Sequence, residues 1–323
     1  MSQHDGITDA KRTTGAGARL LLSAAAVAVM VALPVGLAIH SVRDARLAVD
    51  DTVTGTLADA ATVFDRIGYN TDDHDGPGHV IPRVMLTELP RELPHISDTT
   101  QRKALFLTTV LPHILKVNEI IRAERETLLD LVARQNAGVD LVDGERQWLI
   151  ALATKYRTDE DAIDVLVRRV NVIPPSLALA QAAIESGWGT SRFAQKGNAI
   201  YGQWTWGEDG MVPLGRPEGQ RYRIRTFGHL VESVAAYARN LNTHQAYTDL
   251  RQMRAELVRS GSPLTGPALT PALEQYSTRR GEYVTDVDQI IRTNRLTRFD
   301  QMSLQYSALD GGGISSTESA TLY

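Results

Sequence analysis

The chain has 323 residues, enough for one large domain or two of ordinary size. Its composition is that of a globular protein, 43% hydrophobic and 22% charged, and its net charge of −4 gives no general electrostatic reason to bind nucleic acid. The absence of cysteine excludes disulfide bonds, thiolate zinc ligands, cysteine nucleophiles and a cysteine-linked lipid anchor. Nothing in the sequence resembles a nucleotide-binding or metal-binding motif, so we expect neither a cofactor nor a metal.

An uncharged, apolar run at residues 20–39 is long enough to cross a bilayer once. The basic residues Lys11, Arg12 and Arg19 precede it. The positive-inside tendency therefore predicts that residues 1–19 are a cytoplasmic tail. We expect the rest of the chain to lie outside the cytoplasmic membrane.

The same run also has features of a cleaved signal peptide. Pro34 divides it, and Gly36-Leu37-Ala38 is a small-x-small cleavage pattern. We favour a retained single-pass anchor because the whole run can span the bilayer. A protein secreted after signal cleavage is the alternative.

Composition divides the remainder of the chain into a linker, a domain and a tail. Residues 40–80 include an acidic, Gly/Pro-rich stretch around His74, which lacks regular ligand spacing and is predicted to be a linker rather than a metal site. The domain is expected at residues 81–305, with its core at 170–300. Residues 306–323 are expected to form a disordered tail.

Helical periodicity dominates the predicted domain, and no strand–helix alternation of the parallel α/β type is present. We predict helices at residues 101–133, 143–156, 159–170, 175–186, 229–242, 248–259, 271–276 and 283–294. Pro112 is expected to kink or interrupt the first of these. Residues 201–227 instead alternate in strand fashion around turns, which predicts a small antiparallel β-hairpin or sheet. The fold class is therefore mainly α, of the α+β type.

One acidic residue stands out on an apolar helix. The helix starts at Pro174-Pro175-Ser176, and nearly every residue from 177 to 184 is Leu, Ala or Ile, so most of its circumference should be buried. Gln181 and Glu185 break the pattern, and their spacing of four puts them on one face. A carboxylate at the end of a buried helix is costly unless it is used, which makes Glu185 a candidate functional acid.

The residues around Glu185 carry a family resemblance. Residues 180–191, Ala-Gln-Ala-Ala-Ile-Glu-Ser-Gly-Trp-Gly-Thr-Ser, and residues 197–202, Gly-Asn-Ala-Ile-Tyr-Gly, resemble the signature of the β-N-acetylglucosaminidase domain of glycoside hydrolase family 73. Within that group the chain most resembles the bacterial Bax family. Further similarity lies at residues 102–106, 111–112, 240–244 and 276–284. The resemblance covers residues 80–300 approximately and implies a lysozyme-like fold, a helical bundle with a small β-lobe that forms the cleft.

The resemblance also implies that Glu185 is the general acid. Glycosidic cleavage needs a carboxylic acid that is still protonated near neutral pH and can protonate the leaving oxygen. Burial against an apolar wall, for which Trp188 is the expected residue, raises the pKa of a glutamate. An isolated glutamate would more often have a structural role, but within this motif the catalytic role is favoured.

The second participant in catalysis is left open by the sequence. A carboxylate could activate water or act as the nucleophile, and Glu218 is the first choice, ahead of Glu208 and Asp209; a solvated loop acid is an equally good explanation of each. Alternatively, the 2-acetamido oxygen of the substrate attacks the anomeric carbon. In that route Tyr201, at a position where the family has Phe or Tyr near the cleft, would orient the acetamido group.

Five residues are candidates for substrate binding: Gln181, Trp188, Trp204, Trp206 and Tyr276. The two tryptophans at 204 and 206 alternate along a predicted strand and offer a platform for a pyranose ring, with packing as an equal alternative. Gln181 would hold either Glu185 or the 2-acetamido group. Tyr276 matches a family position near the cleft, whereas packing roles are favoured for Glu232 and Tyr237.

The sequence as a whole predicts an exported, membrane-tethered hydrolase without a cofactor. It would cleave the β-1,4 bonds of peptidoglycan strands after N-acetylglucosamine, as an endo-β-N-acetylglucosaminidase. Two alternatives stay open. One is a non-catalytic scaffold that binds cell-wall glycan, and the other is a lytic transglycosylase, which also uses a single glutamate.

Overall fold

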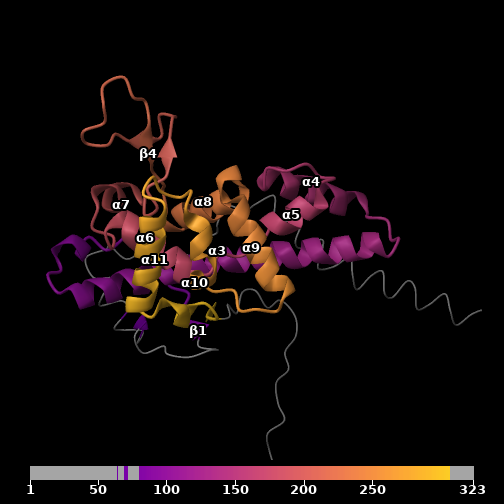
Figure 1. Cartoon of the computed structure of the whole chain (residues 1–323), viewed down its shortest axis with the longest axis horizontal. Helices are drawn as coiled ribbons and strands as arrows, with labels where there is room; N and C mark the ends of the chain where they lie inside the picture. Colours follow the sequence, from indigo (N-terminus) through magenta and orange to yellow (C-terminus); the bar gives the residue numbers. More distant parts are fainter. Residues whose placement is uncertain (1–63, 65–68, 72–79, 306–323) are drawn as a thin grey trace, which may run out of the picture.

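The computed structural model describes residue 64, residues 69–71 and residues 80–305 (Figure 1). The predicted cytoplasmic tail, the apolar run at 20–39, nearly all of the linker and the tail at 306–323 lie outside the described residues. Within them the chain is mainly helical, with one small antiparallel sheet and one short parallel pair of strands. This arrangement confirms the predicted fold class.

Helix α3 (Thr99–Asn136) is the longest element. It begins where the Asp98 side chain accepts a hydrogen bond from the Gln101 amide, 2.9 Å. The helix continues through Pro112, so the expectation of an interruption there was wrong. Pro112 and its neighbours Leu111 and Ile114 are buried, and this packing outweighs the loss of one backbone hydrogen bond.

Among the described residues, α3 is also the helix whose length and composition would allow it to cross a membrane. However, 78% of its most apolar window is buried inside the fold. Burial on this scale is typical of a core helix, and α3 is one: its first half packs on α6 (Pro175–Ser186) and α8 (Leu230–Thr243).

The other helices are α4 (Asp143–Lys155), α5 (Ile163–Arg169), α7 (Arg192–Gly197), α9 (Thr248–Arg259), α10 (Gly266–Leu269) and α11 (Gly281–Thr293), with short 3-10 helices at Leu93–His95, Gln245–Tyr247, Thr270–Leu273 and Leu296–Phe299. Of these, α4, α9 and α11 lie close to the predicted ranges. The sequence did not predict α7. The helix predicted at 159–170 is shorter, and the one predicted at 271–276 is replaced by α10 and a 3-10 turn.

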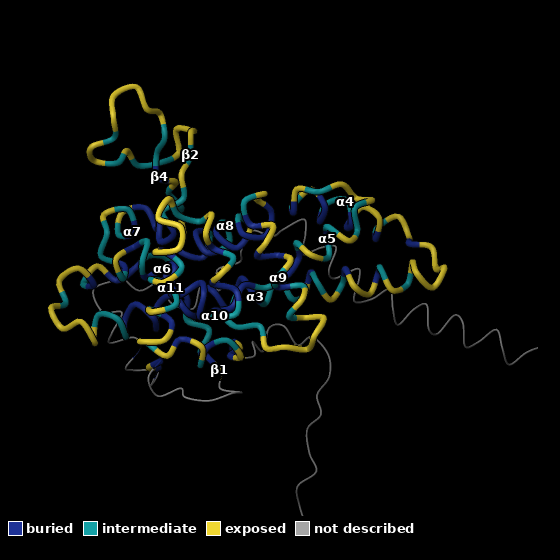
Figure 2. The backbone as a smooth tube through the Cα atoms, viewed as in Figure 1, coloured by how far each residue is buried: buried dark blue, intermediate teal, exposed yellow. Residues whose placement is uncertain are grey.

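The apolar side chains form two cores. The larger surrounds α6, all of whose residues from Pro175 to Ala183 are buried, as the apolar run predicted (Figure 2). The smaller joins the far end of α3 to α4 and α5, with Trp148 and Leu152 at its centre. Figure 1 shows these three helices extending away from the main body.

A three-stranded antiparallel sheet forms the β-lobe. Its strands are β2 (Trp204–Thr205), β3 (Gly210–Met211) and β4 (Arg223–Arg225), in the order β2-β4-β3. The central strand is β4, which pairs Ile224 with Trp204 on one side and Met211 on the other. The small sheet was predicted, and Figure 1 shows that it projects from the helical body.

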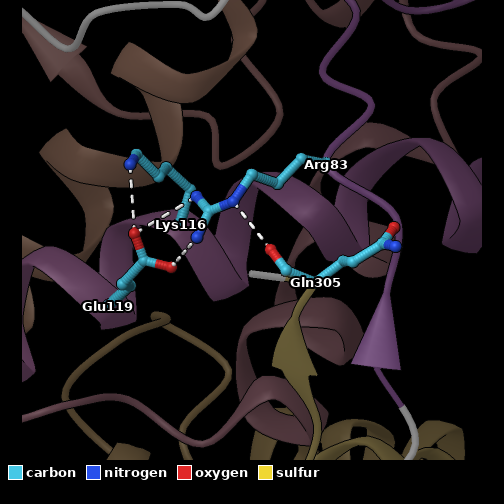
Figure 3. A network of polar contacts seen from close by, with 4 residues as sticks. All are labelled: Arg83, Lys116, Glu119 and Gln305. Atoms are coloured by element: carbon cyan, nitrogen blue, oxygen red, sulfur yellow. Dashed lines mark hydrogen bonds and ion pairs between the residues drawn. The ribbon is translucent and has the colours of Figure 1, made fainter. Parts of the chain in front are cut away.

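The two ends of the described main body lie together. Strand β1 (Val80–Ile81) pairs in parallel with β5 (Ser303–Leu304), a contact that the sequence did not predict. Figure 3 shows Arg83 fastening this pair to α3. Its guanidinium group donates to the Gln305 carbonyl at 2.8 Å and to both carboxylate oxygens of Glu119, at 2.7 and 3.2 Å. Burial of Glu119 raises its pKa, but hydrogen bonds and charge from Arg83 and Lys116 outweigh this, so the pKa is lowered.

The start of α6 is held by a second buried network. Asp300 accepts hydrogen bonds from the backbone amide and from the hydroxyl group of Ser176, both at 2.8 Å. The amide of Gly266 in turn donates to the Ser176 hydroxyl at 2.9 Å. A Cβ at Gly266 would lie 2.4 Å from that hydroxyl oxygen, so glycine is required for this close approach.

We expect Asp300→Ala to lower the free energy of unfolding by about 1–3 kcal/mol, because it removes the cap of α6 and leaves buried donors unpaired. Chemical denaturation measures this. The matched control is Glu256→Ala, which removes a carboxylate from an exposed ion pair with Arg259 and should have little effect. Equal stabilities of the two variants would show that the network does not anchor α6.

Candidate active site

A cleft of 1510 Å³ runs across the molecule, with Glu185 in its wall. The end of α6, the start of the β-lobe and the connection between the Thr270–Leu273 turn and α11 line one part of it. One face of α8 and residues from α3 and α4 line the rest. The cleft therefore brings together segments that are far apart in the sequence.

The backbone after α6 fixes the position of Glu185. Gly187, Trp188 and Gly189 all have left-handed conformations, with φ of 58°, 56° and 77°, and they reverse the chain immediately after the helix. On the other side, Gly202 also has a positive φ, and a Cβ there would lie 3.5 Å from a carboxylate oxygen of Glu185. The first residues of the β-lobe can thus pass close beside the carboxyl group.

Trp188 does not form the apolar wall that the sequence suggested. Its ring packs edge-on against Phe106 of α3, with centroids 5.7 Å apart, and the Lys103 ammonium lies 4.8 Å from its centroid. Trp188 is not among the residues that line the cleft. The reversed backbone turns the indole toward α3, so its place is in the packing behind the site.

A chain of hydrogen bonds connects Glu185 to three helices. Gln181 is fully buried; its carbonyl oxygen accepts from the Tyr237 hydroxyl at 2.7 Å, and its amide nitrogen donates to the Tyr283 hydroxyl at 3.0 Å. Tyr283 in turn hydrogen-bonds to Glu185. Gln181 therefore holds two tyrosines, and it reaches Glu185 through Tyr283 rather than directly. With both ends of its amide occupied, it does not face the cleft.

Tyrosine rings take the place that was expected for Trp188. Tyr201 stacks on Tyr237 with ring centroids 3.8 Å apart, and Tyr276 stacks on Tyr283 at 5.3 Å. Burial in these surroundings raises the pKa of Glu185, and the Tyr283 hydrogen bond and the charge of Arg279 oppose the rise only in part. The carboxyl group therefore stays protonated to a higher pH than an exposed glutamate.

The remaining aromatic candidates have different surroundings. Tyr201 and Tyr276 line the cleft, and the buried hydroxyl of Tyr201 has no hydrogen-bond partner within the described residues. Trp204 also lines the cleft; it is 59% exposed and stacks on Tyr222 at 4.6 Å. Trp206 directly follows β2, is 73% exposed and is not part of the lining, but its ring packs edge-on against Trp204 with centroids 6.5 Å apart.

The acidic candidates of the β-lobe lie apart from the cleft lining. Glu218 is exposed in the loop between β3 and β4, and Glu208 and Asp209 are exposed in the turn before β3. Two other carboxylates, Glu232 and Glu274, do line the cleft. Glu232 lies on α8 and accepts a hydrogen bond from the Gly228 amide, 3.1 Å. Within the described residues, no group of three or more His, Asp or Glu side chains is arranged to hold a metal ion.

Sequence reasoning did not assign the contact between Tyr283 and Glu185. Tyr283 lies about 100 residues from Glu185 along the chain, and periodicity places it only on a helix. The sequence feature that could have pointed to Tyr283 is the family resemblance at residues 276–284, which contain this tyrosine.

A family model matches the part of the chain that contains Glu185. The family model described as mannosyl-glycoprotein endo-beta-N-acetylglucosaminidase matches residues 161–296. The chain is also 35% identical over 193 residues to Protein bax of Escherichia coli strain K12. The chain is thus similar to the Bax protein and contains a match to the glucosaminidase family model. The similarity to the Escherichia coli protein covers 57% of this chain and 66% of that protein, just under two thirds of its length.

Among solved structures, the catalytic domain of the autolysin Auto from Listeria monocytogenes matches 54% of this chain and 97% of its own length. The sequence identity is 19% and the TM-score is 0.32. The glucosaminidase match begins at residue 161, whereas α3 and α4 precede it. Part of the cleft lining is thus supplied by helices outside the matched domain.

We expect Tyr283→Phe to raise the pKa of Glu185 further, because it removes a hydrogen bond that lowers this pKa and leaves the burial in place. A pH titration of the ¹³C-labelled carboxyl signal of Glu185, assigned with Glu185→Gln, measures the shift. Tyr276→Phe is the matched control, since its ring stacks on Tyr283 but its hydroxyl is not a hydrogen-bond partner of Glu185 in the described part of the chain. A downward shift in Tyr283→Phe would contradict the assigned contact.

Proposed function

We propose that this protein is a peptidoglycan hydrolase that cleaves the β-1,4 bond after N-acetylglucosamine, with Glu185 as the general acid. The observation that carries the proposal is a partly buried Glu185 with a raised pKa in the wall of a long cleft. The glucosaminidase domain at residues 161–296 includes this residue and supports the assignment.

The environment of Glu185 suits proton donation. The acid must carry its proton when the substrate binds, and the raised pKa keeps a larger fraction of Glu185 protonated than an exposed glutamate at the same pH. In the reaction, the carboxyl proton passes to the glycosidic oxygen as the bond from that oxygen to the anomeric carbon breaks. Tyr283, itself held by Gln181, fixes the orientation of the carboxyl group and stabilises the carboxylate that is left.

For the attack on the anomeric carbon, the surroundings of Tyr201 favour the substrate-assisted route. The 2-acetamido oxygen bonds to the anomeric carbon, the leaving sugar takes the proton of Glu185, and water then opens the cyclic intermediate and returns a proton to Glu185. Tyr201 lines the cleft, and its buried hydroxyl has no partner within the described residues, so an acetamido group that reaches it can accept its hydrogen bond. Glu218, by contrast, is exposed in a loop outside the lining. Trp204, exposed at the cleft, offers a flat face for a neighbouring sugar ring.

A peptidoglycan substrate implies a location outside the cytoplasmic membrane. The apolar run at residues 20–39 provides for export and for tethering, although it lies outside the described residues. We propose that it is retained as a single-pass anchor. N-terminal sequencing of the exported protein distinguishes this from signal cleavage, since cleavage would leave a chain that begins after residue 38.

We expect Glu185→Gln to reduce kcat on purified peptidoglycan by roughly 10²- to 10⁴-fold, the usual contribution of a general acid. The wild-type rate should fall as the pH rises through the pKa of Glu185, because only the protonated form donates. Turbidity loss of a peptidoglycan suspension measures the rate, and mass spectrometry identifies the products. Reducing-end N-acetylglucosamine is expected.

Three outcomes would contradict this assignment. If the Glu185→Gln variant keeps its activity, Glu185 is not the general acid. Anhydro-muramic acid products identify a lytic transglycosylase, and binding of glycan without any cleavage by the wild type identifies a scaffold.

We expect Tyr201→Phe to lower kcat by roughly 10²-fold, the scale of one lost transition-state hydrogen bond. Stability should not fall, because the hydroxyl that is removed has no partner within the described residues. Rate assays on peptidoglycan and thermal unfolding test both statements. An unchanged kcat would exclude a role of Tyr201 in the reaction and would favour the alternative in which a second carboxylate activates water or acts as the nucleophile.

A further inference from the structure

The cleft continues from Glu185 along one face of α8. The residues of this helix that line it are Glu232, Ala235, Ala236, Ala238, Arg239, Asn240, Asn242 and Thr243. The alanines leave space above the helix. Residues of α3 and the end of α4 face this extension, including Lys116 and Arg157. The extension is therefore a groove that leads away from the acid catalyst.

Three arginines from three different elements lie in this groove. Arg157 follows α4, Arg225 belongs to β4, and Arg239 lies on α8; all three are exposed and line the cleft. Within the described residues none of them forms an ion pair, although Arg225 lies over the ring of Phe227. The two lysines that line the same cleft do form ion pairs, Lys116 with Glu119 and Lys155 with Glu124.

Arg239 lies within the electrostatic influence of both Arg157 and Arg225. The pKa of Arg239 is lowered first by burial and then by the positive charges of Arg157 and Arg225. The three arginines form no ion pair within the described residues, although Glu232 and Glu274 line the same cleft. Clustered positive charges raise the local concentration of anions, and the fork of a guanidinium group matches a carboxylate.

The cluster is also close to the site of cleavage. The Arg225 amide donates to the Gln203 carbonyl at 2.8 Å, and Gln203 directly follows Gly202, which lies beside Glu185. An anionic group held by the cluster would therefore belong to the same polymer that occupies the catalytic site.

We propose that Arg157, Arg225 and Arg239 form a subsite that binds the carboxylate groups of the acidic peptides attached to the glycan strand. This rests on the proposed function, because the substrate must be peptidoglycan for such peptides to be present. The N-acetylated sugars are themselves uncharged, and the carboxyl group of muramic acid is joined to the peptide by an amide bond. The peptides therefore supply the anionic groups that fit this cluster.

The test compares the wild type with Arg157→Gln/Arg239→Gln on two substrates, both freed of phosphate-containing polymers. One is peptidoglycan with its peptides intact, and the other is the same glycan after the peptides have been removed by an amidase and the muramic acid carboxyl groups that this exposes have been converted to uncharged amides. We expect the double variant to lose roughly 10-fold in kcat/KM on the peptide-bearing substrate, as two ion pairs are removed, and to match the wild type on the bare glycan. The variant Arg157→Lys/Arg239→Lys, which keeps both charges, should recover part of the loss. Added salt should reduce the preference of the wild type for the peptide-bearing substrate over the bare glycan.

Arg168→Gln is the matched control, since Arg168 is exposed and does not line the cleft. Thermal unfolding checks that the double variant is folded. If the double variant is unfolded, the single variant Arg239→Gln replaces it in the same comparison of the two substrates. Equal losses on both substrates, or no loss on either, would overturn the proposal.

A binding measurement separates this proposal from the proposed function. In the Glu185→Gln background, soluble peptide-bearing and peptide-free oligosaccharides are titrated by calorimetry, with and without the two arginine substitutions. Weaker binding of the peptide-bearing fragments alone supports the subsite even if the wild type cleaves nothing. Unchanged binding, or a loss confined to a phosphate-bearing wall polymer, overturns it.

Discussion

The site depends on the hydrogen-bonded chain from Tyr237 through Gln181 and Tyr283 to Glu185. Each member comes from α6, α8 or α11, so the three helices must pack in one arrangement for the chain to close. A buried amide whose two ends are both satisfied costs little, whereas one left without partners costs several times more. The same contacts that hold the carboxyl group therefore also specify how the helices around α6 are arranged.

Glu185 is held between two opposing requirements. Burial raises its pKa and keeps the proton available, but a carboxyl group without polar partners would be neither oriented nor stabilised after it has lost that proton. Tyr283 supplies the contact on one side, and Gly202 keeps backbone rather than a side chain on the other. The stacked tyrosines exclude water without adding a formal charge, which lets a single weak acid work inside a helical bundle.

The sequence was informative where local composition decides the structure. The apolar run of α6, its end at Ser186 and the exceptional Glu185 were predicted because a buried helix with one acid leaves a clear pattern. The direction of Trp188 was not, since it depends on three successive left-handed residues and on α3, which lies about 80 residues earlier. The pairing of β1 with β5 and the contact between Tyr283 and Glu185 join distant segments, and no periodicity reports such contacts. The exposed position of Glu218, outside the cleft lining, was also not predictable, because the sequence pattern of a polar loop residue is the same whether the residue faces a cleft or solvent.

The position of the pair of β1 with β5 bears on how the folded body is held from its N-terminal side. Strands β1 and β5 lie side by side, on the side of the molecule opposite the β-lobe (Figure 1). This pair is not the first point at which the chain joins the folded body, because Phe64 and Tyr69, which precede β1, are buried in the main core. The β-lobe and the strand pair thus mark opposite ends of the body, and a pull on the N-terminal side would be resisted first by the packing of Phe64 and Tyr69 rather than by the strands.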